Sequence, residues 1–472
     1  MRAALVTPLS GPLAEFGRAG AAALRLWARS AGRVELSVHD SAPGVSQALA
    51  DALDERPDLL FGPYGTGQAT ALARKTDRLV WNHGGAGDRL SNHAHVVNVL
   101  SPCSSYFTGA VELLHREIAS LTVLHGETTF GREVAAGAER AATGRGLTVR
   151  RAGFAPGSAE EAVRNAPEAG AVMIAAGFAD ERAAARLLPE RPWRACVLVG
   201  AGEENVLDEA REGLIGPTQW LADEAWEPDE GPDAGWFVRN YVAATGADPP
   251  YPAAQAFAAG VIASRCARDV GDLDDDALRA AASALTCTTM FGRFELDASG
   301  AQVGHQMLTV QWQDGRRRTV WPPERARGRR VRALRGHLHV PHTADLRIEA
   351  WAPTREGCVT EAVSGLVGSF ADTTDVRPQR TDVLNVPPQP DPDLLVAVLD
   401  DVIYRLEVHG ELVLDAEITT APDGGLTAGL KLGDATKVTA IGAIPKAVSL
   451  HELRLTRDPM TDAWSCAVTI DV

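Results

Sequence analysis

Short apolar runs alternate with helix-length amphipathic stretches from residue 2 to about residue 322, and this alternation constrains the fold more than any single motif. Strands separated by helices of this length form βαβ units with parallel strands. Runs that are apolar nearly throughout, such as 171–176, are typical of sheets covered on both faces. The pattern spans 1–116 and restarts over 117–235, which predicts two α/β lobes rather than one very large sheet.

Beyond the second run the pattern changes. A long apolar helix is expected at 252–268 and a polar helix near 274–285. Two further runs, 292–296 and 305–312, flank the turn-forming sequence Asp297-Ala298-Ser299-Gly300 and predict a β-hairpin.

Residues 336–472 form a separate unit with a different pattern. Strands are expected at 337–341 and 347–351, followed by a helix at 354–370. After a proline-rich loop, residues 391–407 carry apolar side chains at helical spacing. Four strand-like runs close the chain, at 411–418, 426–431, 446–455 and 464–472. The pattern predicts an α+β domain.

Charge is divided unevenly along the chain, whose net charge is −16. Residues 1–315 carry −13, residues 336–472 carry 10 basic against 21 acidic side chains, and residues 316–335 hold nine arginines and one glutamate. An acidic surface argues against bulk nucleic-acid binding, which needs clustered cations. We expect the arginine-rich run to be a solvated linker, with 323–335 joining the two units. A tether that contacts RNA or phosphate is the alternative.

Cysteine spacing and hydropathy indicate the cellular setting. The six cysteines show no CxxC spacing, so neither a disulfide framework nor a zinc ribbon is expected. The first residues run out of apolar side chains well before the ~7–15 that a signal peptide needs. Apolar stretches also fall short of the ~18 residues of a membrane span. We therefore expect a soluble cytoplasmic protein.

Three glycine-rich loops follow predicted strands of the first unit, at 10–12, 62–67 and 82–87. Ligands of open α/β sheets bind beyond the carboxyl ends of the strands, where helix N-termini present free N–H groups. Glycines let the backbone approach a ligand, and the hydroxyls of Ser10 and Thr66 add donors. The loops suit a small anion such as a carboxylate. The alternative interpretation is that these glycines only make tight turns.

With these loops the first unit resembles the type 1 periplasmic binding-protein family, in particular its branched-chain amino-acid and amide branch. The segments that carry the resemblance are Thr7-Pro8-Leu9-Ser10-Gly11-Pro12, Phe16-Gly17, Phe61-Gly62-Pro63-Tyr64, Asn82-His83-Gly84-Gly85, Phe130-Gly131 and Trp321-Pro322. The resemblance covers about 1–322. It implies two lobes around a cleft, lobe I comprising 1–116 and 236–287 and lobe II comprising 117–235 and 288–322.

The same resemblance implies a ligand site. Thr66, Gly84 and Ala86 would hold a ligand carboxylate, and Glu203 would face an amino group. Phe16, Phe130 and Phe178 stand where the family often has tyrosine, so we expect an apolar wall without hydroxyl groups. Cytoplasmic members that sense small amides are the better analogy for this chain. The alternative is a substrate-binding receptor for an amino-acid ABC transporter.

Sequence motifs of enzymes are less well matched in the first unit than those of the binding-protein family. Gly65-Thr66-Gly67 opens a helix as a dinucleotide fingerprint does, but Thr70 replaces the third glycine. A GxxxxGK[ST] motif and a GxSxG nucleophile elbow are both absent from the sequence. We therefore expect no enzymatic activity here.

Histidines and carboxylates gather at the start and end of the second unit. His337, His339, His342 and Asp345 fall within nine residues, and strand alternation puts the first two on one face. At the other end, Asp471 stands beside the terminal carboxylate of Val472. Oxygen clusters of this kind suit Ca²⁺, Mg²⁺ or Mn²⁺. Solvated histidines at a strand edge and a solvated chain end are the alternative interpretation.

At these residues the second unit resembles archease, a small α+β protein that assists the tRNA-splicing RNA ligase. The matching segments are His342-Thr343-Ala344-Asp345, Asp393-Leu394-Leu395, Asp400-Asp401-Val402-Ile403-Tyr404, Pro445-Lys446-Ala447-Val448 with His451-Glu452-Leu453, and Val468-Thr469-Ile470-Asp471-Val472. The resemblance implies a divalent metal ion at Asp345, Asp471 and Val472. It also implies a functional lysine at Lys446, with His342 beside the phosphate or partner contact.

The implied role is that of a protein cofactor of the RNA ligase, which would meet RNA through the ligase and would not catalyse alone. Ser449-Leu450 departs from the Thr-Tyr common in the family, which alters the surface beside Lys446. The acidic charge of this unit favours contact with a basic ligase surface over a direct grip on RNA. A metal-dependent hydrolase is the remaining alternative.

Overall fold

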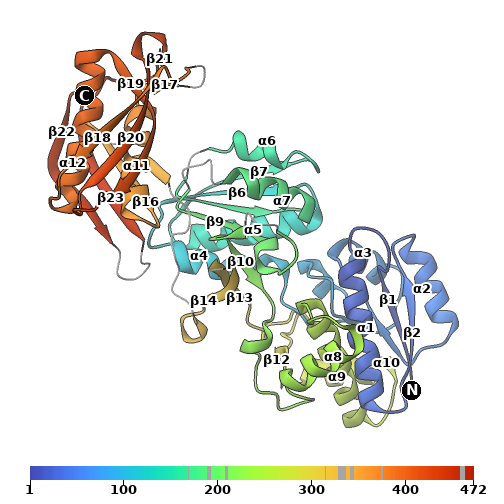
Figure 1. Ribbon diagram of the computed structural model, residues 1–472. Coiled ribbons are helices and arrows are strands. Elements are labelled where there is room, and N and C mark those ends of the chain that lie inside the picture. Colours follow the sequence, from blue (N-terminus) through green and yellow to red (C-terminus); the bar gives the residue numbers. More distant parts are fainter. Residues whose placement is uncertain are drawn as a thin grey trace.

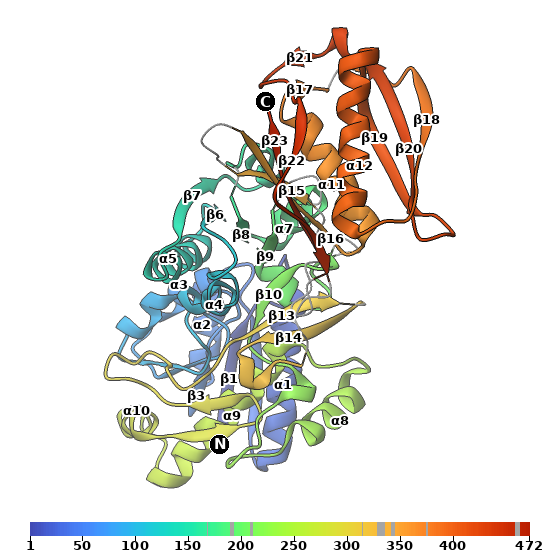
Figure 2. The same ribbon diagram turned by 90° about the vertical axis from the view of Figure 1, so that its left-hand side faces the viewer.

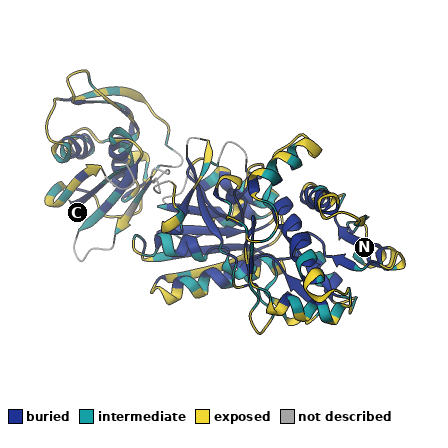
Figure 3. Ribbon diagram, turned by 90° about the horizontal axis from the view of Figure 1, so that it is seen from below, coloured by how far each residue is buried: buried dark blue, intermediate teal, exposed yellow. Residues whose placement is uncertain are grey.

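The computed structural model describes residues 1–167, 169–188, 193–207, 211–313, 315–327, 336–340, 345–373, 376–457 and 463–472. Three bodies follow one another in space, with the N-terminus in the first and the C-terminus in the last (Figure 1). We call them lobe I, lobe II and the C-terminal domain. Buried residues concentrate in the sheets of each body, and exposed residues concentrate on outer helix faces and loops (Figure 3).

Lobe I is built on a five-stranded parallel sheet with the order β2-β1-β3-β4-β5. Its strands are β1 (Arg2–Thr7), β2 (Glu35–Asp40), β3 (Leu59–Phe61), β4 (Val80–Asn82) and β5 (Val96–Asn98). The helices between them are α1 (Ala14–Ala31), α2 (Val45–Asp54) and α3 (Thr66–Ala73), with a 3₁₀ turn, η1 (Asp88–Asn92), before β5.

Three later helices complete lobe I: α8 (Ala234–Thr245), α9 (Tyr251–Val270) and α10 (Asp275–Ala284). The expected helices at 252–268 and 274–285 are thereby confirmed. Helix α9 packs along α1, because Gly260 leaves room for the indole of Trp27; a Cβ at residue 260 would come within 2.4 Å of that ring. Trp27 is 1 % exposed and belongs to the apolar core.

Lobe II holds a seven-stranded sheet with the order β14-β13-β10-β9-β8-β6-β7. Its strands are β6 (Ser120–Gly126), β7 (Thr148–Phe154), β8 (Ala171–Ala175), β9 (Ala195–Leu198), β10 (Ile215–Thr218), β13 (Leu308–Gln313) and β14 (Arg316–Trp321). Its helices are α4 (Thr108–Leu114), α5 (Thr129–Gly144), α6 (Ala159–Arg164) and α7 (Phe178–Leu187). The last two strands run antiparallel to their neighbours.

Four expectations about the two lobes and the linker are wrong. Helix α4 packs against α5, β10, β13 and β14, so the first stretch of lobe I ends before residue 108 and not at 116. The run at 292–296 pairs with β11 (Cys287–Thr289) through β12 (Gly292–Phe294), and not with the run at 305–312, because a two-residue turn brings the nearer partner first. The chain accordingly rejoins the lobe II sheet only at β13, not at 288. The first arginines of the expected linker form the edge strand β14, where a charged edge discourages pairing with other chains.

The C-terminal domain is α+β, as expected. One antiparallel sheet has the order β15-β16-β23-β22, and a second has the order β18-β20-β19. Its strands are β15 (Gly336–Val340), β16 (Leu346–Ala352), β17 (Ala371–Asp372), β18 (Arg380–Val386), β19 (Glu411–Thr420), β20 (Leu426–Asp434), β21 (Thr439–Ala440), β22 (Ala447–Arg457) and β23 (Trp464–Asp471). Helices α11 (Arg355–Gly368) and α12 (Asp391–Tyr404) supply much of its apolar core.

Within the part of the chain that the structure describes, every helix is too short or too polar to cross a bilayer.

Candidate functional site

The loop that follows β4 is held in shape by the side chain of Asn82. Its amide group donates to the carbonyl oxygen of Gly85 at 2.7 Å and to the side-chain oxygen of Asn98 at 2.8 Å, and its own oxygen accepts the N–H of Gly85. Gly84 lies so close to the preceding loop that a Cβ would come within 2.5 Å of the Cα of Tyr64. The glycines therefore permit a close approach of two backbones.

Of the predicted carboxylate-binding residues, three are buried in neighbouring loops and one is exposed elsewhere. Thr66 is buried and begins α3, and Gly84 and Ala86 are buried in the neighbouring loop. Ser10, in contrast, is exposed and donates its hydroxyl hydrogen to Asp40 at 2.8 Å. The loops at 62–67 and 82–87 thus come together, while Ser10 turns to the end of β2.

A cavity between the lobes brings together two of the other predicted ligand residues, Phe178 and Glu203. Its remaining lining residues are Tyr106, Val199, Pro217, Thr218, Gln219, Tyr251 and Met307. Phe178 begins α7, and Glu203 follows the 3₁₀ turn η4 (Val199–Gly202) beyond the carboxyl end of β9. This is the edge of the sheet at which ligands of α/β proteins bind.

The expectation of a wall without hydroxyl groups is wrong. Tyr106 and Tyr251 line the cavity, and the hydroxyl oxygens of Tyr251 and Tyr64 lie 2.6 Å apart. Gln219 donates its amide N–H to the hydroxyl of Tyr106 at 3.0 Å. The tyrosines were missed because they come from helix N-termini and not from the positions where the family often has tyrosine; their place before two apolar helices was the available signal.

Glu203 is a buried carboxyl group in this aromatic setting. Burial raises the pKa of Glu203 to about 8, and Arg317 partly opposes that rise. The Arg317 guanidinium donates to the carbonyl oxygen of Gly202 at 2.5 Å and pairs with Glu204 at 3.1 Å. The carboxyl of Glu203 is therefore protonated in a substantial fraction of molecules near neutral pH and can donate or accept a hydrogen bond.

Aromatic side chains close the cleft from both lobes. The ring of Phe16, on α1 of lobe I, stacks on Tyr64 at 5.0 Å and contacts Phe178 of lobe II at 5.4 Å. Phe130 packs edge-on against Tyr106 with the ring centroids 5.6 Å apart. Phe130 thus lies behind a cavity-lining ring, which places it outside the set of residues that line the cavity itself.

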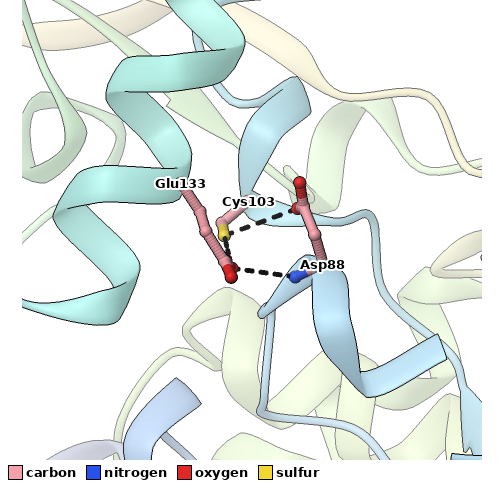
Figure 4. Close-up of side chains that lie close together, drawn as sticks. All are labelled: Asp88, Cys103 and Glu133. Atoms are coloured by element: carbon pink, nitrogen blue, oxygen red, sulfur yellow. Dashed lines mark hydrogen bonds between the residues drawn. The ribbon is translucent and has the colours of Figure 1, made fainter. Parts of the chain in front are cut away.

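A second cavity adjoins Ala86, Gly87 and Asp88, and a three-residue cluster lies beside it. The carboxylate of Glu133, on α5 of lobe II, accepts the backbone N–H of Asp88 at 2.9 Å and the thiol of Cys103 at 3.2 Å (Figure 4). Among the described residues these three place potential metal-binding atoms within 4.8 Å of one another. Burial and the two carboxylates raise the pKa of the Cys103 thiol, so the thiol stays protonated as a donor.

In the C-terminal domain, the predicted metal-binding residues meet at one end of the first sheet. Asp345 immediately precedes β16, whose Leu346 pairs with Ile470 on β23, and Ala447 on β22 pairs with Asp471. The backbone N–H of Lys446 donates to the carbonyl oxygen of Asp471 at 2.8 Å. Residues separated by about a hundred positions in the sequence are thereby brought to the same edge.

This edge is accessible to solvent. Lys446 and Asp471 are exposed, and Asp345 and Val472 are half-buried. Asp400, on α12, accepts the backbone N–H of Val448, while burial raises its pKa. Asp400 belongs to one of the segments that resemble archease, and the structure adds it as a third carboxyl group next to the Lys446 segment. His342 lies outside the described residues.

Carboxylates of Asp345 and Asp471 with a main-chain oxygen of Val472 would supply an oxygen donor set of the kind that suits a hard divalent cation. The two neighbouring histidines are not part of it. His337 lies 3.0 Å from the carboxylate of Glu361, and His339 lies 2.8 Å from the carbonyl oxygen of Gly365, both on α11. They share a strand face, as expected, but that face turns toward the helix.

Two α/β lobes around a cleft, followed by an α+β domain with an acidic edge, define a binding protein fused to a second module. A family model described as "Periplasmic binding protein" matches residues 1–317, and one described as "Archease protein family" matches residues 338–472. The chain therefore belongs to the periplasmic binding protein family and carries a C-terminal domain of the archease family.

Individual relatives agree with both assignments. A "Probable protein archease" of Mycobacterium tuberculosis is 48 % identical over 137 residues, which are 29 % of this chain and 75 % of that protein. A leucine binding protein from Thermotoga maritima has a TM-score of 0.59 at 17 % identity, covering 68 % of this chain and 97 % of that chain. A solute binding protein from Rhodopseudomonas palustris in complex with benzoate has a TM-score of 0.58 at 17 % identity, covering 68 % and 95 %. These structural similarities establish the fold of the two lobes.

Proposed function

We propose that the chain is a cytoplasmic protein cofactor of the tRNA-splicing RNA ligase, fused to a module that senses an amino acid or amide. The observation that carries the proposal is the convergence of Asp345, Lys446 and Asp471 at one exposed sheet edge. A cation held by carboxylates beside a lysine can organise phosphate groups at the active site of a partner. The 48 % identity to a probable archease supports the same role.

The surface around Lys446 supports contact with a protein partner. Ile441, Ile444 and Leu450 are 59 %, 60 % and 70 % exposed and flank Lys446 in the sequence. Large apolar side chains grouped on a surface mark interaction sites more often than single ones do. The pairing of β22 with β23 is irregular between Ser449 and Arg454, and Glu452 there has a φ of 53°. Such bulges redirect side chains, and here they accompany the exposure of Leu450.

A guanylylation assay of the cognate RNA ligase tests the proposal. The full chain should accelerate guanylate transfer to the ligase in the presence of Ca²⁺, Mg²⁺ or Mn²⁺, because the metal-bearing edge would engage the phosphates. Lys446→Ala should abolish this stimulation, whereas Lys437→Ala, which removes an exposed lysine paired with Asp434, should retain it. Equal activity of the two variants, or hydrolysis of nucleotide without ligase, would refute the cofactor role.

For the N-terminal module we infer a small ligand whose amine or amide N–H faces Glu203. The cavity residues support this inference, since a buried carboxyl group and tyrosine hydroxyls line one space. Relatives of this fold include a leucine binding protein and a solute binding protein in complex with benzoate, so both ligand chemistries belong in the test. A receptor for an ABC transporter is the alternative role, and export of the protein would favour it.

Thermal-shift titration of the full chain with amino acids, their amides and benzoate separates these chemistries. A ligand that binds only the folded state raises Tm with its concentration. Glu203→Gln should weaken binding of amines but leave benzoate unaffected. If no ligand shifts Tm in the wild type, the sensing proposal fails while the ligase assay remains informative.

A further inference from the structure

The C-terminal sheet has an outer face, opposite α11 and α12, formed on β16 by Arg347, Glu349 and Trp351. Strand alternation separates these residues from Ile348, Ala350 and Ala352, which lie in the helix-covered core. Trp351 is nevertheless only 1 % exposed, and its indole Nε1 is fully buried. A tryptophan on a sheet face without helices must be covered by another part of the chain.

Lobe II lies against this outer face (Figure 2). The guanidinium of Arg194 forms an ion pair with Glu349 and lies over the ring of Trp351, 5.4 Å from its centroid. The two charged side chains are 18 % and 19 % exposed, so both are largely removed from solvent. A charge at such a site is costly unless it is paired, and the pairing gives the contact specificity.

Arg194 and Glu349 are each held in place by contacts within their own domain. Arg194 donates its backbone N–H to Gly170 at 3.0 Å and a guanidinium N–H to the carbonyl oxygen of Glu117 at 3.3 Å. On the other side, Arg347 and Arg454 approach Glu349 to 3.9 Å. The contact thus joins two pre-ordered surfaces, which lowers the entropic cost of association.

The contact lies at the opposite end of lobe II from the cleft. Glu117, Gly170 and Arg194 precede β6, β8 and β9, whereas Val199 and Glu203, which line the cavity, follow β9. The strand itself is buried throughout. One rigid strand therefore separates the ligand cavity from the contact with the C-terminal domain.

We propose that the amino-terminal edge of the lobe II sheet is a docking surface for the outer face of the C-terminal sheet, with Arg194 as its central residue. Lobe II and the C-terminal domain then move as one body, and lobe I moves against both. The dock covers β16 but leaves the edge with Lys446 and Asp471 exposed, so a partner can engage that edge while the domains are joined.

Hydroxyl-radical footprinting of the full chain, read by mass spectrometry at Trp351, tests the dock. Wild type should protect Trp351 as strongly as the core residue Trp312, which is 0 % exposed and serves as an internal reference. Arg194→Glu faces Glu349 with a like charge, so oxidation of Trp351 should rise severalfold while Trp312 is unchanged. Arg194→Lys should keep most of the protection.

A second variant shows whether the pair itself is responsible. Glu349→Gln removes the repulsion, so Arg194→Glu combined with Glu349→Gln should be protected better than Arg194→Glu alone. Arg182→Glu, the same charge change at an exposed position of α7, should match wild type. The proposal is overturned if Trp351 oxidises as fast in wild type as in Arg194→Glu, or if Arg182→Glu exposes it equally.

Discussion

The backbone N–H of Lys446 donates to the carbonyl oxygen of Asp471 at 2.8 Å, which fixes the functional lysine of the archease resemblance next to a predicted metal ligand. Main-chain hydrogen bonding sets this proximity, so it survives substitution of either side chain. The lysine and the carboxylates can therefore be tested one at a time.

Asp345→Ala and Asp471→Ala should each abolish Ca²⁺ or Mn²⁺ binding, because each removes a carboxylate oxygen from the proposed donor set. Isothermal titration calorimetry of the full chain measures the loss. Asp393→Ala, an exposed carboxylate in the first turn of α12, is the matched control and should bind metal as wild type does. Metal binding that persists in both site variants would place the cation elsewhere.

Glu203 should make the folded state less stable as pH rises. Its pKa of about 8 in the folded state lies above the ordinary value of 4.5, so the folded state binds the proton more tightly than the unfolded state does. The free energy of unfolding therefore decreases as the pH rises from 4.5 to about 8. Glu203→Gln should flatten the decline of Tm from pH 5 to pH 9. Glu181, whose pKa burial also raises to about 8, remains in the variant, so part of the slope should persist. An unchanged slope would contradict the burial of Glu203.

Asp382→Asn should destabilise the C-terminal domain at neutral pH. Arg405 is 9 % exposed and donates to Asp382 at 2.7 Å and to Asp401 at 2.5 Å, and this contact lowers the pKa of Asp382 to about 2. The stabilising effect of the pair is present above the ordinary value of 3.8 and is lost as pH falls through about 2.

Thermal unfolding at pH 7 and pH 2 provides the measurement. Asp382→Asn should lower Tm at pH 7 and have little effect at pH 2. Asp415→Asn breaks a pair with Lys431 in which both side chains are more than half exposed, and such pairs contribute little. Equal losses for the two variants would show that burial of Arg405 is not what makes its pairing important.

Gly260→Ala should destabilise lobe I by about 1–3 kcal/mol, the usual cost of overpacking. Its Cβ would come within 2.4–2.8 Å of three atoms of the Trp27 ring, and neither α1 nor α9 can move without disturbing the core. Gly144→Ala, at the end of α5 with no atom within 4 Å of the added Cβ, should be neutral or stabilising by up to ~1 kcal/mol. Chemical denaturation of both variants distinguishes the two cases.

Sequence patterns predicted elements well where one local signal dominates. The alternation of strands and helices indicated both lobes, and the apolar stripe after 251 indicated α9 within two residues of its bounds. The arginines at 316–318 were assigned to a linker because charge suggested solvation, but a sheet edge also tolerates charge. Which strand pairs with β13 depends on tertiary contacts that local composition does not encode.

The residues of the acidic edge could be predicted from the sequence more completely than those of the cleft. Asp345, Lys446 and Asp471 were named correctly as neighbours because a family resemblance supplied what spacing could not. In the cleft, Tyr106 and Tyr251 escaped notice because helices separated by about 145 positions bring them to one cavity. The spacing of His337 and His339 suggested metal ligands, but in the structure both rings contact residues of α11.

The position of β9 has a practical consequence. With the ligand cavity at one end of this strand and Arg194 at the other, the proposed dock predicts that closure of the cleft would change the distance between lobe I and the C-terminal domain and leave the distance from lobe II to that domain constant. A fluorophore on α2 and another on α12 would therefore report ligand occupancy by energy transfer, because the dock keeps the C-terminal domain in a fixed position relative to lobe II.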